Sequence, residues 1–268
     1  MSEKGIITFE GKTINFYHKK ARNKPVLVFL HGFCEDLHLW KEYIDGFSKY
    51  EIVLIDLPGF GKSEVIEEAD IPVMAKVVKA VIDSLNLEKF FLIGHSMGGY
   101  VGLEFAKRYQ YHLQGFVLFH SHPYAEDAAM LANRKKSIAF IKRNQSAIFV
   151  KQLFPNLFSP RFLSSNRHRV DMLILRASRF SDKGIVNALE AMSVRDDNCE
   201  TLEKIKVPVC FIIGERETII PKAFSLGQTI LPDIADVHLI PNVNHMGMFE
   251  AERQTQRIIK QFVSRHLD

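Results

Sequence analysis

Ser96 stands in a pattern that would make its hydroxyl a nucleophile. Four apolar residues, Phe90 to Ile93, predict a buried strand of a parallel sheet, and Tyr100 to Tyr109 follow with helical periodicity. Between them lies Gly94-His95-Ser96-Met97-Gly98-Gly99, a Gly-x-Ser-x-Gly turn joining a strand to a helix. Glycines are needed there because the serine must take a strained backbone conformation that leaves its neighbours no room for bulk. This context favours a nucleophile over an ordinary glycine-rich turn.

The residues that would activate Ser96 come late in the sequence. A serine hydroxyl needs a histidine to take its proton and a carboxylate to orient that histidine. His245 follows a predicted strand and precedes the last helix, which favours a base over a surface histidine. The acid is expected at the end of the preceding strand, in Gly214-Glu215-Arg216-Glu217. We favour Glu217, although Glu215 points the same way in an extended segment and loop shape decides between them.

The elements that must position these residues alternate along the chain. Residues 5–20 predict a hairpin around Glu10-Gly11-Lys12. Further strands are predicted at 26–30, 52–56, 90–93, 115–120, 207–213 and 237–240, and helices at 39–50, 72–86, 97–109, from 221 and from about 250. Alternating strands and helices predict an α/β fold, a mostly parallel, doubly wound sheet with helices on both faces.

A helical block interrupts this alternation. The segments 125–143, 146–153, 160–180 and 182–193 have helical periodicity, and no convincing strand separates them. The block leaves the sheet at the carboxyl end of a strand, where α/β sheets bind their ligands, so it is well placed to form a lid. We therefore expect a core of residues 1–121 and 199–268 and an inserted helical cap of residues 122–198.

Composition narrows the class of protein. The chain has 268 residues, 47% of them hydrophobic, enough for one large domain or a domain with an insert. Its formal net charge of +4 is spread along the sequence, whereas a nucleic-acid-binding protein would concentrate it. No stretch approaches the roughly 18 apolar residues of a membrane span, and no apolar signal segment is seen. We therefore expect a cytoplasmic protein without nucleic-acid or membrane partners.

Motifs for metals and organic cofactors are missing or incomplete. Cys34, Cys199 and Cys210 are far apart and show no spacing typical of zinc or redox chemistry. Gly61-Lys62-Ser63 resembles the end of a phosphate-binding loop, but Asp56 stands where that loop requires its first glycine. No Gly-x-Gly-x-x-Gly opens a helix after a strand. We predict neither a metal nor a cofactor.

Taken together, the motifs resemble those of one family. They are His31-Gly32-Phe33, Asp56-Leu57-Pro58-Gly59-Phe60-Gly61, Gly94-His95-Ser96-Met97-Gly98-Gly99, Gly214-Glu215-Arg216-Glu217 and Asn244-His245. This set is similar to that of the α/β hydrolases, of the capped esterase and lipase-like kind, over nearly the whole length. The resemblance implies an oxyanion hole from the backbone N–H groups of Phe33 and Met97. Each donor would stabilise the tetrahedral intermediate by roughly 3 kcal/mol.

One position departs from the family pattern. The acid of the Gly-x-x-acid motif is usually an aspartate in these relatives, and here it is Glu217. Glutamate carries the same charge on a stem one methylene longer, so it can fill the role. Some members carry the acid after the strand that here ends at His120, but no carboxylate follows that strand before Glu126.

Several further residues are candidates for substrate binding. His31 and Gly32 belong to the oxyanion loop, and His95 precedes the nucleophile, where packing is the better explanation for it. Trp40 could form a wall of the acyl pocket, although helix packing explains it equally well. His120, His122 and Tyr124 lead from the sheet into the cap, and lining the pocket or stabilising the junction are equal explanations for them.

The expected activity is hydrolysis of a small carboxylic ester through an acyl-enzyme. Relatives that hydrolyse carbon–carbon bonds or thioesters, lactonases, and lyase-type relatives share these motifs and differ in the cap. Arg134, Lys135 and Arg143 in the cap would favour an anionic substrate if they faced the pocket. A binding protein that kept the fold without catalysis is a further alternative, in which Ser96 would form no covalent intermediate.

Overall fold

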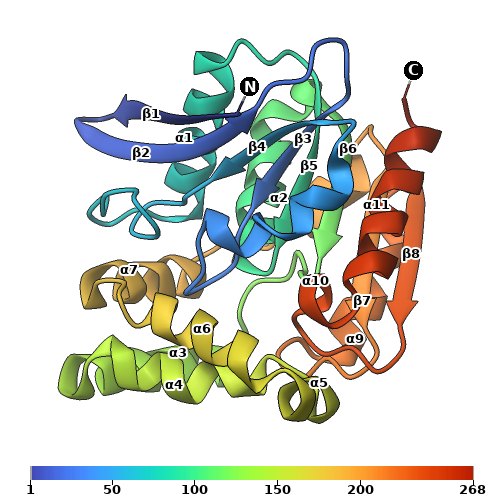
Figure 1. Cartoon of the computed structure of the whole chain (residues 1–268). Coiled ribbons are helices and arrows are strands. Elements are labelled where there is room, and N and C mark those ends of the chain that lie inside the picture. The colour runs from blue at the N-terminus through green and yellow to red at the C-terminus, as the bar shows by residue number, and fades with distance from the viewer. Residues whose placement is uncertain (1, 268) are drawn as a thin grey trace.

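Eight strands form one sheet at the centre of the molecule (Figure 1). The computed structural model describes residues 2–267, and the strand order is β1-β2-β4-β3-β5-β6-β7-β8. Strands β1 and β2 form the predicted hairpin, β2 and β4 also pair antiparallel, and the other pairs are parallel. The strands are Ser2–Phe9 (β1), Lys12–Lys19 (β2), Val26–Leu30 (β3), Glu51–Ile55 (β4), Phe90–His95 (β5), Leu113–Phe119 (β6), Val209–Gly214 (β7) and Ala235–Ile240 (β8). The prediction of a mostly parallel sheet is confirmed.

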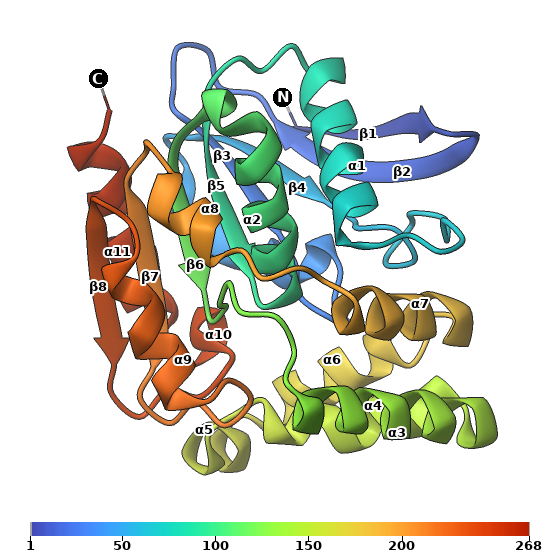
Figure 2. The same cartoon turned by 180° about the vertical axis from the view of Figure 1, so that it is seen from behind.

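Helices cover both faces of this sheet, as predicted (Figures 1 and 2). One face carries α1 (Ile71–Ser84), α2 (Met97–Tyr109), α8 (Cys199–Lys204) and α9 (Lys222–Gly227). The other carries α11 (Glu252–Arg265) and the 3-10 helices η1 (Leu37–Trp40) and η2 (Tyr43–Phe47). Short helices η3 (Gln110–His112), η4 (Gln228–Ile230) and α10 (Gly247–Glu250) complete the core. Within residues 2–267, no helix combines the length and apolar character that a membrane span requires.

The core is built where helices press on the central strands. Strands β4, β5 and β7 are buried along their whole length because helices lie on both sides of them. On α11, Ile258, Ile259 and Phe262 form the predicted apolar stripe and are buried. The Phe262 ring lies 6.0 Å from that of Phe91, and a Cβ at Gly115 would lie only 2.9 Å from the Phe262 ring. A glycine in β6 therefore allows α11 to approach the sheet.

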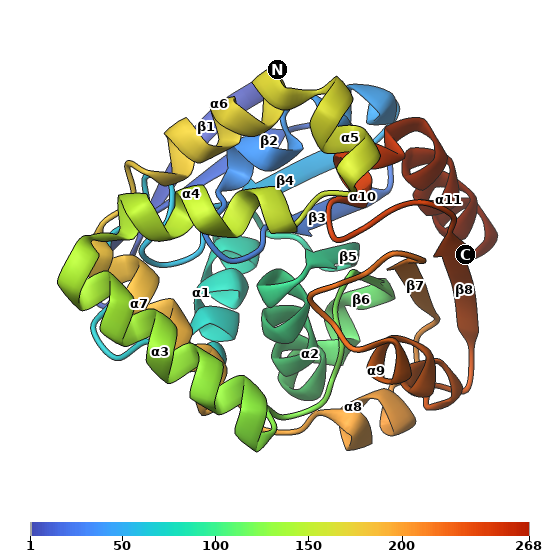
Figure 3. The same cartoon turned by 90° about the horizontal axis from the view of Figure 1, so that it is seen from below.

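A helical insert lies between β6 and α8. It consists of α3 (Ala128–Asn144), α4 (Ser146–Asn156), α5 (Pro160–Ser165), α6 (Arg167–Ala177) and α7 (Asp182–Ser193). Seen from below, these helices extend across the carboxyl ends of the parallel strands (Figure 3). Since that edge of the sheet also carries the turn after β5, the insert faces the residues expected to do chemistry.

Two local predictions were wrong and one short helix was missed. The helix expected over 160–180 is two helices that meet at Asn166, whose backbone and side-chain N–H groups both bond to the Phe162 carbonyl and end α5. The helix expected over 39–50 is the pair of 3-10 helices η1 and η2. Helix α8 was not predicted, because six residues are too few to show a helical period.

Candidate active site

Ser96 lies at the sharp turn between β5 and α2. Its backbone has φ 49° and ψ −117°, a strained conformation for a residue with a side chain, and α2 begins at the next residue, Met97. The first N–H groups of any α-helix lack partners within the helix, so this helix end directs donors toward the serine. The turn therefore has the geometry predicted from the sequence.

Glycines hold this turn against the neighbouring strand. A Cβ at Gly98 would lie 2.6 Å from the carbonyl oxygens of both Leu30 and His31, which end β3 and begin the next loop. A Cβ at Gly94 would lie 2.5 Å from the carbonyl oxygen of Gly98. Both distances are too short for any side chain, so backbone alone fits where β3 and the turn meet.

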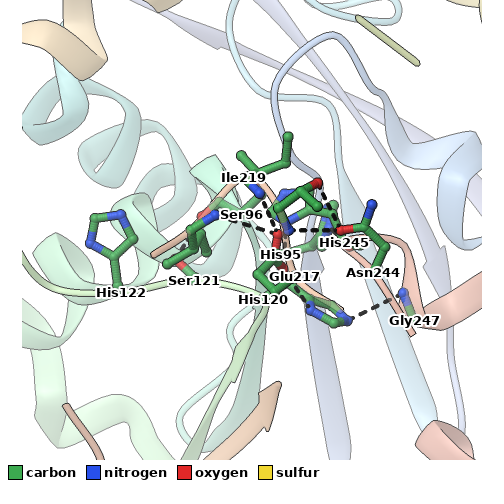
Figure 4. A network of polar contacts seen from close by, with 12 residues as sticks. His95, Ser96, His120, Ser121, His122, Glu217, Ile219, Asn244, His245 and Gly247 are labelled. Carbon is green, nitrogen blue, oxygen red and sulfur yellow. Dashed lines mark hydrogen bonds and ion pairs between the residues drawn. The ribbon is translucent and has the colours of Figure 1, made fainter. Parts of the chain in front are cut away.

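His245 and Glu217 are in direct contact. His245 Nδ1 lies 2.9 Å from Glu217 Oε2, and both side chains are almost fully buried (Figure 4). Burial alone would raise the pKa of Glu217, but the charge of His245 and hydrogen bonds from His120 and His245 outweigh it and hold the pKa well below 4.5. Burial lowers the pKa of His245, yet Glu217 outweighs burial there too, and the pKa rises above 6.5. Of the two glutamates, Glu217 is therefore the one bonded to His245, whereas Glu215 is exposed and accepts the Asn242 N–H at 3.0 Å.

The loop that carries His245 is fixed to the helical insert. The His245 N–H donates to the Leu157 carbonyl at 3.0 Å, and the Asn244 side chain donates to the Asn156 carbonyl at 3.0 Å. Asn244 Oδ1 accepts the Thr218 N–H at 2.9 Å, which ties this loop to the one that carries Glu217. The two loops and the end of α4 therefore form one hydrogen-bonded unit.

A buried pair lies behind His245. His95 Nε2 lies 3.1 Å from the His245 carbonyl oxygen, an acceptor, and His95 Nδ1 lies 3.0 Å from Glu35 Oε2. The Gly32 N–H also donates to Glu35 Oε2, at 2.6 Å. Burial would raise the pKa of Glu35, but the charge and hydrogen bond of His95 lower it overall. His95 thus orders the backbone of His245 and the loop after β3 together.

Ser96 and His245 open into one cavity of about 270 Å³. The core contributes Phe33 to its lining, and the insert contributes apolar side chains including Phe149, Leu153 and Met192. A larger hollow of about 430 Å³ lies between α6 and η1, but none of the residues predicted to act in catalysis lines it. The smaller cavity is therefore the candidate active site.

Comparison with known proteins agrees with this architecture. A family model described as the alpha/beta hydrolase fold matches residues 25–252. The chain belongs to the α/β hydrolase fold family. Curated relatives include the 2-succinyl-6-hydroxy-2,4-cyclohexadiene-1-carboxylate synthase of Klebsiella pneumoniae, 31% identical over 225 residues, which cover 82% of this chain and 86% of the relative. The enzyme of the same name from Escherichia coli is 29% identical over 228 residues, with the same coverage.

Solved structures share this α/β hydrolase fold over almost the full chain. A thermophilic esterase from Thermogutta terrifontis superposes with a TM-score of 0.90 at 21% identity, covering 98% of this chain and 99% of the esterase. An enol-lactonase from Burkholderia xenovorans also gives 0.90, at 17% identity, covering 97% of this chain and 100% of the lactonase. At these identities the similarity concerns the fold alone.

Of the seven residues named for substrate binding, only His122 lines the cavity of this α/β hydrolase. Trp40 is buried among Phe29, Tyr43 and Phe119, so the structure places it in the core rather than in an acyl pocket. His31 Nε2 accepts the Leu57 N–H at 2.9 Å, a bond within the core loops. The others that do not line the cavity are Gly32, His95, His120 and Tyr124.

Charged residues occupy the wall of the cavity formed by the start of the insert. Arg134 donates to Glu126 through Nε and Nη2, at 3.0 and 2.8 Å, and lines the cavity with it. Arg195 is buried, also pairs with Glu126, and lies 4.0 Å from the centroid of the Tyr100 ring. Two guanidinium groups thus share one carboxylate. Burial, together with the charge of Arg195, lowers the pKa of the neighbouring His122 to about 3, so that imidazole is neutral.

One cluster has the residue types of a metal site. Donor atoms of His120, Glu217 and His245 lie within 4.8 Å of one another. The Nδ1 atoms of both histidines are hydrogen-bonded to Glu217 Oε2, so these nitrogens already have partners. The cluster is better described as a hydrogen-bonded network than as a set of free ligands.

Sequence reasoning missed Glu35 and underrated Asn244. Asn244 was quoted only as the neighbour of His245, although a side-chain amide carries both a donor and an acceptor that can fix a loop. Glu35 follows the oxyanion loop within an ordinary polar stretch, and its pairing with His95, 60 residues away, leaves no local trace.

The close approach at Gly98 predicts a specific sensitivity. Gly98→Ala should lower the free energy of unfolding by about 1–3 kcal/mol, because its Cβ would overlap two carbonyl oxygens that cannot move independently. Urea unfolding measures this change. Gly227→Ala is the control, since the Tyr124 hydroxyl at 3.0 Å is its only close neighbour and can rotate away. Equal stabilities for Gly98→Ala and the control would contradict the prediction.

Proposed function

We propose that this protein is a serine hydrolase that cleaves small carboxylic esters through an acyl-enzyme. Ser96 would be the nucleophile, His245 the general base and Glu217 the acid that orients it. The backbone N–H groups of Phe33 and Met97 would form the oxyanion hole. The observation that carries the proposal is the convergence of Ser96 and His245 on one cavity, with His245 Nδ1 held by Glu217.

The proposed reaction follows from this placement. Because Nδ1 donates to Glu217, Nε2 of neutral His245 is the nitrogen free to take the Ser96 proton as Oγ attacks the acyl carbon. The imidazolium then protonates the departing alcohol. Water enters, His245 removes its proton, and attack on the acyl-enzyme releases the acid and restores Ser96. The carboxylate of Glu217 stabilises the imidazolium in both halves of the reaction.

An ester series tests the proposal. We expect hydrolysis of p-nitrophenyl acetate and butyrate at least about tenfold faster than octanoate, because a cavity of about 270 Å³ favours short acyl groups. Ser96→Ala should reduce turnover by about 10³-fold or more. Labelling with a fluorophosphonate probe reports the nucleophile directly. Absence of both turnover and labelling in the wild type would contradict the proposal and favour a non-catalytic binding protein.

A matched pair of glutamate variants tests the acid. Glu217→Gln should lower kcat by about 10³–10⁴-fold, because His245 loses the carboxylate that fixes its tautomer. Activity of the wild type should rise with pH through the raised pKa of His245, since only neutral imidazole accepts the serine proton. In Glu217→Gln the residual activity should rise at lower pH, because the charge that raises that pKa is gone. Glu215→Gln should behave as wild type, and a large loss there would assign the acid to Glu215.

A second candidate is action on an anionic substrate, by hydrolysis or by a lyase-type reaction using the same residues. The cavity wall supports it, because Arg134 lines the cavity and shares its carboxylate partner, Glu126, with the buried Arg195 behind it, while His122 is neutral. The curated relatives are synthases, and the compound in their name is a carboxylate. A substrate carrying a carboxylate near the acyl group could pair with the guanidinium group of Arg134 in this wall.

Two esters of equal acyl length separate the candidates. If the wall binds an anion, p-nitrophenyl hemisuccinate should be cleaved with a higher kcat/KM than p-nitrophenyl butyrate, and Arg134→Gln should reduce that preference about tenfold. Glu126 would keep Arg195 as its partner in this variant. Arg143→Gln, an exposed position on the same helix, is the control. If Arg134→Gln leaves the preference unchanged, the anionic candidate is wrong.

A further inference from the structure

His120 is a buried histidine that the proposed reaction does not use. It follows β6 directly, has φ 49°, and is 2% exposed. Its ring stacks on Phe119 and does not line the cavity, so it cannot touch a substrate there. A polar ring at such a position needs partners, and it has two.

The partners of His120 fix its tautomer. The Gly247 N–H, at the start of α10, donates to His120 Nε2 at 3.2 Å (Figure 4). A backbone N–H can only donate, so Nε2 is unprotonated and the ring proton is on Nδ1. His120 Nδ1 lies 3.2 Å from Glu217 Oε2, and its N–H donates to that oxygen. Burial lowers the pKa of His120 to about 4, so the ring is neutral at neutral pH.

The two carboxylate oxygens of Glu217 accept hydrogen bonds from different groups. Oε1 accepts the backbone N–H groups of Ile219 at 2.9 Å and Ile220 at 3.4 Å, which hold the carboxylate in place. Oε2 accepts from His245 at 2.9 Å and from His120 at 3.2 Å. The two imidazoles thus share one oxygen, and the N–H of the neutral ring offsets part of the negative charge that the other ring meets.

We propose that His120 is a positioning residue that shares Glu217 with His245 and so limits how strongly Glu217 favours the protonated form of His245. The inference deepens the proposed function and rests on it. A buried carboxylate in contact with the base stabilises its protonated form, in which it cannot activate Ser96. The N–H from His120 orients the carboxylate and limits that effect at the same time.

Other charged groups face His245 less directly. Glu250 accepts the backbone N–H groups of Asn244 and Ser159, at 3.0 and 2.9 Å, so these donors partly compensate its charge. Glu35 is paired with His95, which itself contacts His245 only at the carbonyl oxygen. The charges of Glu35 and Glu250 also raise the pKa of His245, but less than Glu217, the carboxylate bonded to its imidazole.

An NMR titration of the His245 imidazole in the intact protein tests the proposal. In His120→Phe the pKa of His245 should rise by about half a unit or more, because Oε2 loses a donor while Oε1 keeps the carboxylate in place. In His120→Asn the amide N–H can replace Nδ1–H, and the pKa should stay within about 0.2 units of wild type. His112→Phe, the same substitution at the other end of β6, is the control and should not shift it.

The rate of fluorophosphonate labelling against pH gives a second readout. Below the pKa of His245, labelling of His120→Phe should be about threefold slower than that of wild type, the change that corresponds to a rise of half a pKa unit. On the plateau at higher pH the two rates should be equal. A merely structural role would lower the plateau without moving the profile.

The outcomes separate this inference from the proposed function. An unchanged or lower His245 pKa in His120→Phe, or an equal rise in His120→Asn, would overturn the role of His120 even if Ser96 labels normally. Missing Ser96-dependent labelling would overturn the proposed function, whereas the titration would still report the effect of His120. Should His120→Phe not fold, the wild-type ¹⁵N spectrum decides: a His120 ring that is protonated at Nε2, or that titrates between pH 5 and 8, overturns the inference.

Discussion

A buried carboxylate that must find partners is the constraint on which this site depends. Glu217 is almost fully shielded from water, and an unpaired charge there would cost several kcal/mol. Four N–H groups compensate it, two from the backbone that follows it and two from histidines in the loops after β6 and β8. Because the donors come from three parts of the chain, satisfying one charge brings together three segments that are distant in sequence.

The longer stem of glutamate fits this arrangement. The carboxylate reaches across the carboxyl edge of the sheet, and its Oε1 turns back to accept the N–H groups of the two residues after Thr218. Gly214 makes the approach possible, because a Cβ there would lie 2.2 Å from the carbonyl oxygen of Asn244. The departure from the aspartate of the family pattern is thus accommodated by backbone contacts within the same loop.

Most of the fold was predictable because it rests on local and periodic signals. Buried strands of four to seven residues and the glycine-bracketed turn at Ser96 are visible in the sequence, and the structure has them. Errors fell where the element is short, as at α5 and α8. For the site, spacing and order brought attention to Glu217 and His245, but choosing Glu217 over Glu215 required the shape of the loop. The pairings of His120 with Glu217 and of Glu35 with His95 could not be predicted, since each joins residues at least 60 positions apart.

The hydrogen bonds from the loop of His245 to the end of α4 have an evolutionary consequence. In this chain the insert supplies the carbonyl groups of Asn156 and Leu157 that hold that loop, in addition to walls for the cavity. An insert exchanged for another of different sequence would have to bring carbonyls to the same two points. The lining of the cavity and the position of the His245 loop therefore depend on the same insert, and divergence of one is restricted by the other.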